Sequence, residues 1–327
     1  MNIVRKALLP VLLAVAFCGC SNAAEKEGKP QASIGKGEQK AMKTYYIGRF
    51  AIDLPAEFTF EMQSQKIRYA EVSDFRWDSA DRGKERETLW SQKIAEIKKL
   101  PKPADKNTVL IEEMNLPSIG KWAKGALYYG DYLNPRRLFY TIFVDYGENG
   151  VWLTIGGTNK EKMVNNFSKV LMHYKTRHEL TTKESFNLKC GNITLPYMEQ
   201  ESSYSIFKGP TGMVLKVEMN EIHKTPEKEG IIERTVASMA TGFAGDLDIK
   251  KIRSGKKKVA GLSGEEEILQ GNDGRKKYVS FDWEYLGTVE SGEQPKIQIT
   301  ADTNTENLED RLIVWEIILN SFRLASQ

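Results

Sequence analysis

The order of sequence signals repeats along the chain, and this repetition constrains the fold more than any single motif does. A strand ending Ile52-Asp53-Leu54-Pro55 opens the first half, and one ending Ile193-Thr194-Leu195-Pro196 opens the second half, about 141 residues later. Self-similarity at a fixed offset is typical of a duplicated structural unit. We therefore expect two similar modules that arose by internal duplication.

Each half then continues with an amphipathic helix, four alternating strands and a closing helix. The first helix is expected within residues 81–100, where Trp90, Ile94 and Ile97 share one face, and its counterpart starts at Thr225-Pro226. Alternation predicts strands at 109–114, 126–132, 138–144 and 151–155, and again at 249–253, 266–270, 277–285 and 296–300. Capping-box patterns, Thr158 with Glu161 and Thr303 with Glu306, precede the two closing helices.

This pattern favours the α+β class, because short turns join the strands and helices occur only near the start and end of each half. Each module is expected to be an antiparallel sheet with one face covered by two helices. The predicted domains are residues 43–178 and 179–327, which meet in a polar stretch near residues 177–184.

The first 24 residues have the layout of a secretory signal peptide: Arg5 and Lys6, an apolar run, and then small residues. Two cleavage sites fit. One is a lipoprotein site at Gly19-Cys20, which would make Cys20 the lipidated residue, and the other follows residues 21–24. Residues 25–42 form a polar tether outside the fold. The sequence thus predicts an exported protein, either lipid-anchored or free.

Charge and cysteine content further limit the classes of function and the kinds of structural bond that the sequence indicates. The net charge is +3, and it becomes +1 without Arg5 and Lys6, so the sequence does not indicate nucleic-acid binding. Residues 20–180 carry 26 Lys/Arg against 21 Asp/Glu, and residues 181–327 carry 19 against 23, a polarity that can steer a protein partner. Cys190 is the one cysteine of the folded part, which excludes a structural disulfide there and favours a small buried side chain.

Motifs for catalysis or cofactor binding are absent from the sequence. His173, His178 and His223 share no metal-ligand spacing, and no nucleophile elbow, P-loop or dinucleotide fingerprint occurs. We therefore expect no catalytic residue, cofactor or metal. The carboxylate pair Glu112-Glu113 keeps one alternative open, an envelope hydrolase, but adjacent strand residues point to opposite faces.

The second half carries residues that resemble a known family. They are Val259-Ala-Gly-Leu-Ser-Gly-Glu-Glu266, Phe281-Asp-Trp-Glu284, Pro295 before an alternating strand, and Trp315 followed by Ile318-Leu-Asn-Ser-Phe-Arg323. This set resembles the immunity proteins of type VI secretion phospholipase effectors, most strongly over residues 185–325. The resemblance implies a periplasmic, non-catalytic protein that binds its cognate effector phospholipase, grips it with two domains and keeps its lid closed.

Seven residues are candidates for partner binding. Lysines 256–258 face glutamates 265–267 across the loop 259–264, which is either a solvated turn or a charged loop tip that meets a partner. Aromatic and arginine residues near loops are the usual anchors of tight interfaces. The candidates are Lys257, Glu265, Glu266, Tyr132, Arg136, Arg137 and Tyr285. Another alternative is an envelope lipoprotein scaffold that binds no toxin.

Overall fold

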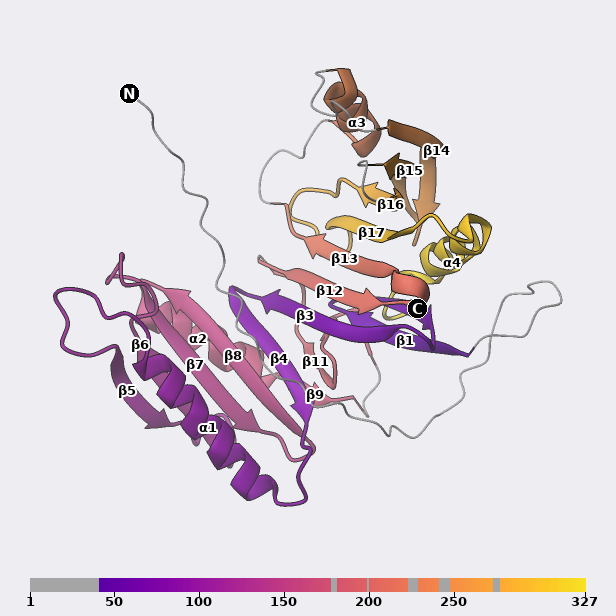
Figure 1. Ribbon diagram of the computed structural model, residues 1–327. Coiled ribbons are helices and arrows are strands. Elements are labelled where there is room, and N and C mark those ends of the chain that lie inside the picture. Colours follow the sequence, from indigo (N-terminus) through magenta and orange to yellow (C-terminus); the bar gives the residue numbers. More distant parts are fainter. Residues whose placement is uncertain (1–40, 178–180, 199, 223–228, 241–247, 273–276) are drawn as a thin grey trace, which may run out of the picture. The chain divides into compact units, whose positions relative to one another are not determined.

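The computed structural model describes residues 41–177, 181–198, 200–222, 229–240, 248–272 and 277–327 (Figure 1). Residues Gln39–Gln327 form one compact unit. The predicted signal peptide, Cys20, His178, His223 and the helix start at Thr225-Pro226 lie outside the described residues, as does the tether up to residue 40. Within the described part, no helix is long and apolar enough to cross a membrane.

One antiparallel sheet of 12 strands runs through this unit, in the order β14-β15-β16-β17-β13-β12-β3-β4-β8-β7-β6-β5 (Figure 1). Strands from the two halves of the sequence meet where β12 pairs with β3, with Tyr204 opposite Ser64. The predicted α+β class with antiparallel pairing is confirmed. The strands are β3 Thr59–Ile67, β4 Ala70–Arg76, β5 Leu110–Asn115, β6 Ala123–Tyr128, β7 Leu138–Asp145, β8 Asn149–Gly157, β12 Ser202–Lys208, β13 Val214–Asn220, β14 Asp248–Val259, β15 Leu262–Asn272, β16 Lys277–Tyr285 and β17 Lys296–Asn304.

The expectation of a separate sheet in each half is wrong. Eight of the strands overlap the predicted segments, but β3, β4, β12 and β13 were not predicted. These four strands occupy the middle of the sheet and join its two halves. A short 3₁₀ helix, Pro210–Gly212, connects β12 to β13.

Four α-helices pack on the sheet: α1 Arg82–Lys98, α2 Lys160–Met172, α3 Ile231–Ala240 and α4 Leu308–Ser321. The prediction that the two helices of a half cover the same face of the sheet is wrong. Helix α1 packs with Phe143 of β7, whereas α2 packs with its neighbour Ile142. Because successive strand residues point to opposite faces, α1 and α2 cover opposite faces of the sheet.

The starts of the closing helices also differ from the predicted capping boxes. Helix α2 is capped by Asn159, whose side chain accepts a hydrogen bond from the Lys162 backbone N–H. Helix α4 starts after Asn307, which has a left-handed backbone conformation and makes no side-chain cap. The Ser/Thr-x-x-Glu spacing therefore predicted both helix starts to within a few residues, but the predicted capping residues, Thr158 and Thr303, are wrong.

Two small sheets exchange strands between the halves. The hairpin β1 Met42–Ile47 and β2 Phe50–Pro55 pairs with β18 Arg323–Leu324, at the end of the chain. The hairpin β10 Ser185–Asn187 and β11 Gly191–Thr194 pairs with β9 Tyr174–Thr176, which closes the first half. Each small sheet thus combines a hairpin from the start of one half with a strand from the end of the other.

The buried cores follow this exchange. Phe50 and Ile52 of the first hairpin pack in one cluster with Trp315 and Phe322 near the C-terminus, and the Phe50 and Phe322 rings stack with centroids 5.1 Å apart. Phe186 and Ile193 of the second hairpin pack with the α2 cluster of the first half. Each half therefore completes the hydrophobic core of the other.

Candidate partner-binding surface

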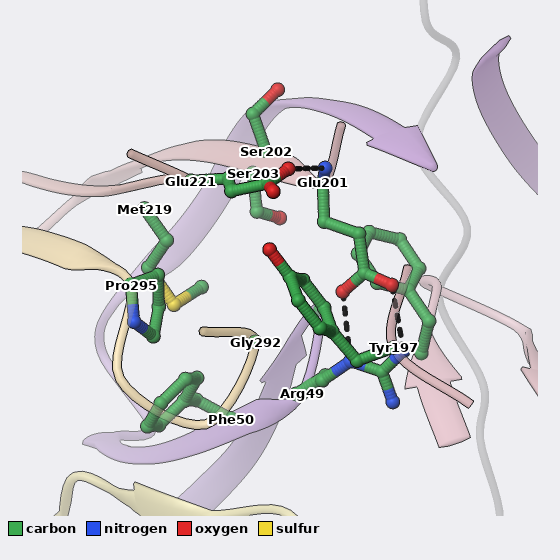
Figure 2. A pocket seen from close by; sticks show the side chains of 12 residues that line it. Arg49, Phe50, Tyr197, Glu201, Ser202, Ser203, Met219, Glu221, Gly292 and Pro295 are labelled. Atoms are coloured by element: carbon green, nitrogen blue, oxygen red, sulfur yellow. Dashed lines mark hydrogen bonds and ion pairs between the residues drawn. The ribbon is translucent and has the colours of Figure 1, made fainter. Parts of the chain in front are cut away.

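A small pocket lies where the β1–β2 turn meets the start of β12 (Figure 2). Arg49, in that turn, binds the Glu201 carboxylate through Nε at 2.7 Å and Nη2 at 2.6 Å. Nη2 also donates to the Leu195 carbonyl at 3.1 Å. The Arg49 and Glu201 side chains are 6% and 9% exposed, so this is a buried ion pair between the two halves.

The charges of this pocket satisfy one another. Burial raises the pKa of Glu201, and the Arg49 guanidinium opposes that effect. Burial, followed by the neighbouring Glu221 carboxylate, raises the pKa of Tyr197, whose ring lies 5.8 Å from the Arg49 guanidinium. The pocket therefore joins the two halves through its buried Arg49–Glu201 pair.

The residues considered for hydrolysis do not converge. Glu112 and Glu113 are both exposed, and Glu113 accepts a hydrogen bond from Trp90 Nε1 of α1 at 2.9 Å. The described residues contain no group of three or more His, Cys, Asp or Glu that could hold a metal. Cys190 lies in the β10–β11 turn instead of on a strand, and burial raises the pKa of its thiol to about 11, which keeps it protonated at neutral pH.

Lys257 and Glu266, predicted at a loop tip, lie in paired strands instead. The turn contracts to Ala260-Gly261, both with positive φ. Glu266 is 4% exposed and accepts hydrogen bonds from Lys257 Nζ at 3.1 Å and from Trp315 Nε1 at 2.8 Å. Lys257 also binds Glu316 of α4 at 2.6 Å. This network fixes α4 to β14 and β15, which explains the charge pattern without a partner.

Glu265 and Tyr285 also have contacts within the protein. A Glu265 carboxylate oxygen accepts a hydrogen bond from the Ile232 backbone N–H at 3.2 Å, at the start of α3. Tyr285 is half-buried against the core, and its hydroxyl lies 3.3 Å from Thr288 Oγ1 and from Gln294 Oε1. Neither side chain projects from the surface as a free anchor.

The loop between β6 and β7 holds the other three candidates, and all of them are exposed. Tyr132 is 54% exposed and its neighbour Leu133 is 75% exposed. Arg136 is exposed, and the exposed Arg137 guanidinium lies 5.2 Å from the centre of the Phe139 ring. These residues remain available for a partner.

Carboxylates gather on the face of β15, β16 and β17 over which α3 lies. Glu284 is paired with Arg234 at 2.8 Å and with Lys296 at 3.3 Å, and Glu267 is paired with Lys251 at 3.7 Å. Burial, followed by the Asp302 carboxylate, raises the pKa of Asp282 to about 6. Negative charge thus exceeds its local compensation around Asp282.

Because Asp282 binds its proton more tightly in the folded chain than in the unfolded one, its contribution to the free energy of unfolding falls as pH rises from about 4 to about 6. Asp282→Asn should therefore stabilise the chain at pH 7.5 by about 1–3 kcal/mol, and its pH dependence should be flatter. Urea unfolding of both proteins at pH 4.5 and 7.5 measures this. An equal difference between the proteins at both pH values would contradict the assignment.

The C-terminal part of the chain is similar to a known family. Residues 188–326 match the family model of the Tle cognate immunity protein 4 C-terminal domain. The matched family is that of the cognate immunity proteins of Tle effectors. No curated protein matches the chain in sequence.

Solved structures extend the likeness over most of this chain. The apo immunity protein TplEi of the Pseudomonas aeruginosa type VI secretion system (T6SS) matches with TM-score 0.70 and 16% identity, over 89% of this chain and 99% of that one. The Tle4–Tli4 complex matches with TM-score 0.70 and 18% identity, over 88% and 98%. TplEi with an "L" peptide matches with TM-score 0.64 and 18% identity, over 88% and 99%. At these identities the likeness establishes the fold.

Proposed function

We propose that this chain is a periplasmic immunity protein that binds a cognate T6SS phospholipase effector and inhibits it. The match of residues 188–326 to the Tle cognate immunity protein 4 family carries the proposal. The similarity to a chain solved in a Tle4–Tli4 complex supports the kind of partner. The alternative of an envelope hydrolase finds no support in Glu112 and Glu113, which do not form a converging acid pair.

Inhibition is proposed to act by gripping the effector with both halves and holding its lid closed. A ligand shifts a two-state equilibrium only by its differential affinity for the two states, so the chain must bind the closed lid more tightly than the open one. The continuous sheet and the buried Arg49–Glu201 pair favour two preorganised halves, which lowers the cost of binding.

The duplication is part of the same proposal. The strand order β3-β4-β8-β7-β6-β5 corresponds to β12-β13-β17-β16-β15-β14, because each half contributes two strands, a helix, four strands and a helix in that sequence. Two related arms would present two surfaces to one partner. Export through residues 1–24, with Cys20 as the lipid attachment site or with release into the periplasm, would place these arms where the effector acts.

Titration of the full chain into the purified lipase encoded beside its gene tests the function. Fatty-acid release from phospholipid vesicles should fall linearly and reach background at one chain per lipase, because a tight inhibitor removes enzyme stoichiometrically. A lipase of another family should be unaffected. Full activity at tenfold excess, or hydrolysis by the chain alone, would overturn the proposal.

The lid mechanism has a separate test. A variant lipase whose lid is held open by a disulfide should bind the chain at least 100-fold more weakly than the same lipase after reduction, as measured by calorimetry. Equal affinity for both forms would contradict inhibition by lid closure while leaving the binding itself intact.

A further inference from the structure

Four connections lie together at one end of the first half's part of the sheet (Figure 1). The strand pairing places them there, because β4 starts where β8 ends, β8 ends where β7 starts, and β6 ends where β5 starts. We call this group of connections the basic end. It consists of the β3–β4 turn 68–69, the α1–β5 segment 99–109, the β6–β7 loop 129–137, and residues 158–162 at the start of α2.

The basic end carries more cations than acids, and most of these cations reach solvent. One further cation, Arg68, is only 8% exposed. Among the acids, Asp105 is paired with Lys106 at 3.0 Å, and Asp131 accepts hydrogen bonds from backbone N–H groups of its own loop. The cations that reach solvent are Lys99, Lys102, Lys106, Arg136, Arg137, Lys160 and Lys162, and the acids are Asp105, Asp131 and Glu161.

The opposite end of the same strands has the reverse charge. Its loops 77–81, 116–122 and 146–148 join β4 to α1, β5 to β6 and β7 to β8, and their charged residues are Asp78, Asp81, Lys121 and Glu148. On the strands next to the basic end the charge is balanced, because Lys66 stands opposite Glu71. Cations are thus concentrated at one end of this half, an arrangement that attracts an anionic partner to that end.

The tip of the β6–β7 loop adds apolar side chains to this charge. Leu133 is 75% exposed and Tyr132 is 54% exposed. The Asp131 carboxylate accepts hydrogen bonds from the Leu133 and Asn134 backbone N–H groups at 3.0 and 3.3 Å. These bonds fix the turn, so the loop presents two apolar side chains in a set conformation, directly before two exposed arginines.

Two aromatic rings of the basic end lie close to lysine ammonium groups. Lys162 Nζ lies 5.7 Å from the centre of the Tyr69 ring, which is 40% exposed. Lys106 Nζ lies 5.8 Å from the centre of the Tyr129 ring. Exposed tyrosine and leucine side chains surrounded by lysine and arginine form a composition typical of surfaces that lie at the boundary between lipid headgroups and acyl chains.

We propose that the basic end docks on the surface of an anionic phospholipid membrane, with Tyr132 and Leu133 at the acyl boundary and the surrounding cations at the phosphate groups. Each lysine or arginine near an anionic membrane adds to the attraction. Five of the seven cations that reach solvent are lysines, a residue type in which protein interfaces are depleted, so the composition favours lipid over a protein partner. The inference goes beyond the proposed function and does not depend on it.

Vesicle co-sedimentation tests the docking on the compact unit Gln39–Gln327, which lacks both the apolar run of the predicted signal peptide and Cys20. Vesicles with about 30% phosphatidylglycerol should bind it about tenfold more strongly than phosphatidylcholine vesicles, because the headgroup charge attracts the cations. Raising the NaCl concentration from about 0.05 M to about 0.5 M should reduce this difference, since salt screens the attraction. Equal binding to both kinds of vesicle, or binding to neither, would overturn the inference.

Two charge-matched double variants locate the contact. Arg136→Glu combined with Arg137→Glu should weaken binding to the anionic vesicles about 30-fold, because two attractive charges become repulsive. Lys256→Glu combined with Lys258→Glu makes the same change in net charge at two exposed positions of β14, and should change the binding less than about twofold. Equal losses in the two double variants would attribute the binding to net charge alone and overturn the assignment.

A gain of binding at the loop tip gives a test that misfolding cannot imitate. Tryptophan is enriched at the boundary between membrane and water, so Leu133→Trp should bind the anionic vesicles about threefold more strongly, and Leu133→Ser should bind them more weakly. Thermal unfolding checks that each variant folds. Unchanged affinity of Leu133→Trp would contradict contact of the tip with lipid.

The same variants separate this inference from the proposed function. Inhibition of the lipase in detergent solution, without vesicles, should be unchanged by Arg136→Glu combined with Arg137→Glu. If this variant inhibits the lipase poorly and the unaltered protein does not bind vesicles, the basic end belongs to the effector interface, and the membrane inference is overturned while the immunity function stands.

Discussion

Removal of residues 1–58 is expected to abolish folding of the C-terminal half, although most of that half's sequence would remain. The deletion takes away β1 and β2, whose Ile47, Phe50, Ile52 and Leu54 are each at most 1% exposed in the core around Trp315. Burying such a side chain contributes about 1.5–3 kcal/mol. Four of them together contribute roughly as much as the whole stability of a typical domain, about 5–15 kcal/mol.

Tryptophan fluorescence reports the effect, because Trp283 and Trp315 are 0% exposed in the intact protein. Deletion of residues 1–40 serves as the control and should unfold cooperatively like the full chain. Attaching residues 42–58 after Gln327 through a flexible linker of about ten residues should restore folding of the deleted protein, because β2 pairs directly with β18. Cooperative unfolding of the deletion variant at the full-chain midpoint would show that the hairpin is dispensable.

The second large effect is expected at Arg49. Arg49→Met leaves the Glu201 carboxylate buried without its cation, and breaking a buried pair in this way costs about 3–5 kcal/mol. The double variant with Glu201→Met should recover most of the loss, since no buried charge remains. Urea unfolding of both variants at pH 7.5 measures the difference.

The pH dependence of the same variant separates charge from packing. Burial already raises the pKa of Glu201 with Arg49 present, and removal of the guanidinium raises it further. The destabilisation by Arg49→Met should therefore shrink as pH falls and Glu201 takes up a proton. A deficit that stays constant down to pH 4.5 would point to lost side-chain packing as the cause.

Local patterns predicted the outer parts of the fold well. The periodicity of Trp90, Ile94 and Ile97 identified the buried face of α1, and the alternation over residues 277–285 identified β16. The middle strands β3, β4, β12 and β13 were not predicted from the sequence. In β3, residues Thr59 to Ile67, polar residues occur on both faces, so alternation does not mark the strand. Its inward polar side chain Gln65 is satisfied by Ser203 and the Asn187 carbonyl, contacts that only the folded chain reveals.

The candidate site was harder to predict from sequence because charge alone does not distinguish a partner contact from an internal bond. Lys257 and Glu266 have the composition of a recognition loop, yet they hold α4 in place. Strand register brings Met62 and Ile206 together, and register between distant strands cannot be derived from local alternation.

Because the hairpins are exchanged, one arm is contiguous in sequence and the other is split between the two ends of the chain. Residues 59–196 contain β3 through β11, including all three strands of one small sheet. The corresponding arm consists of β12 through β18 together with β1 and β2 from the start of the chain. One arm is therefore inserted into the other, and the two ends of the described chain meet in one arm. Recombination that exchanges 59–196 as a block would transfer an intact arm between relatives, while a crossover near residue 178 would leave each arm with a hairpin that evolved for a different core. Under the proposed two-arm grip, partner specificity would evolve one arm at a time only through exchanges at these inner boundaries.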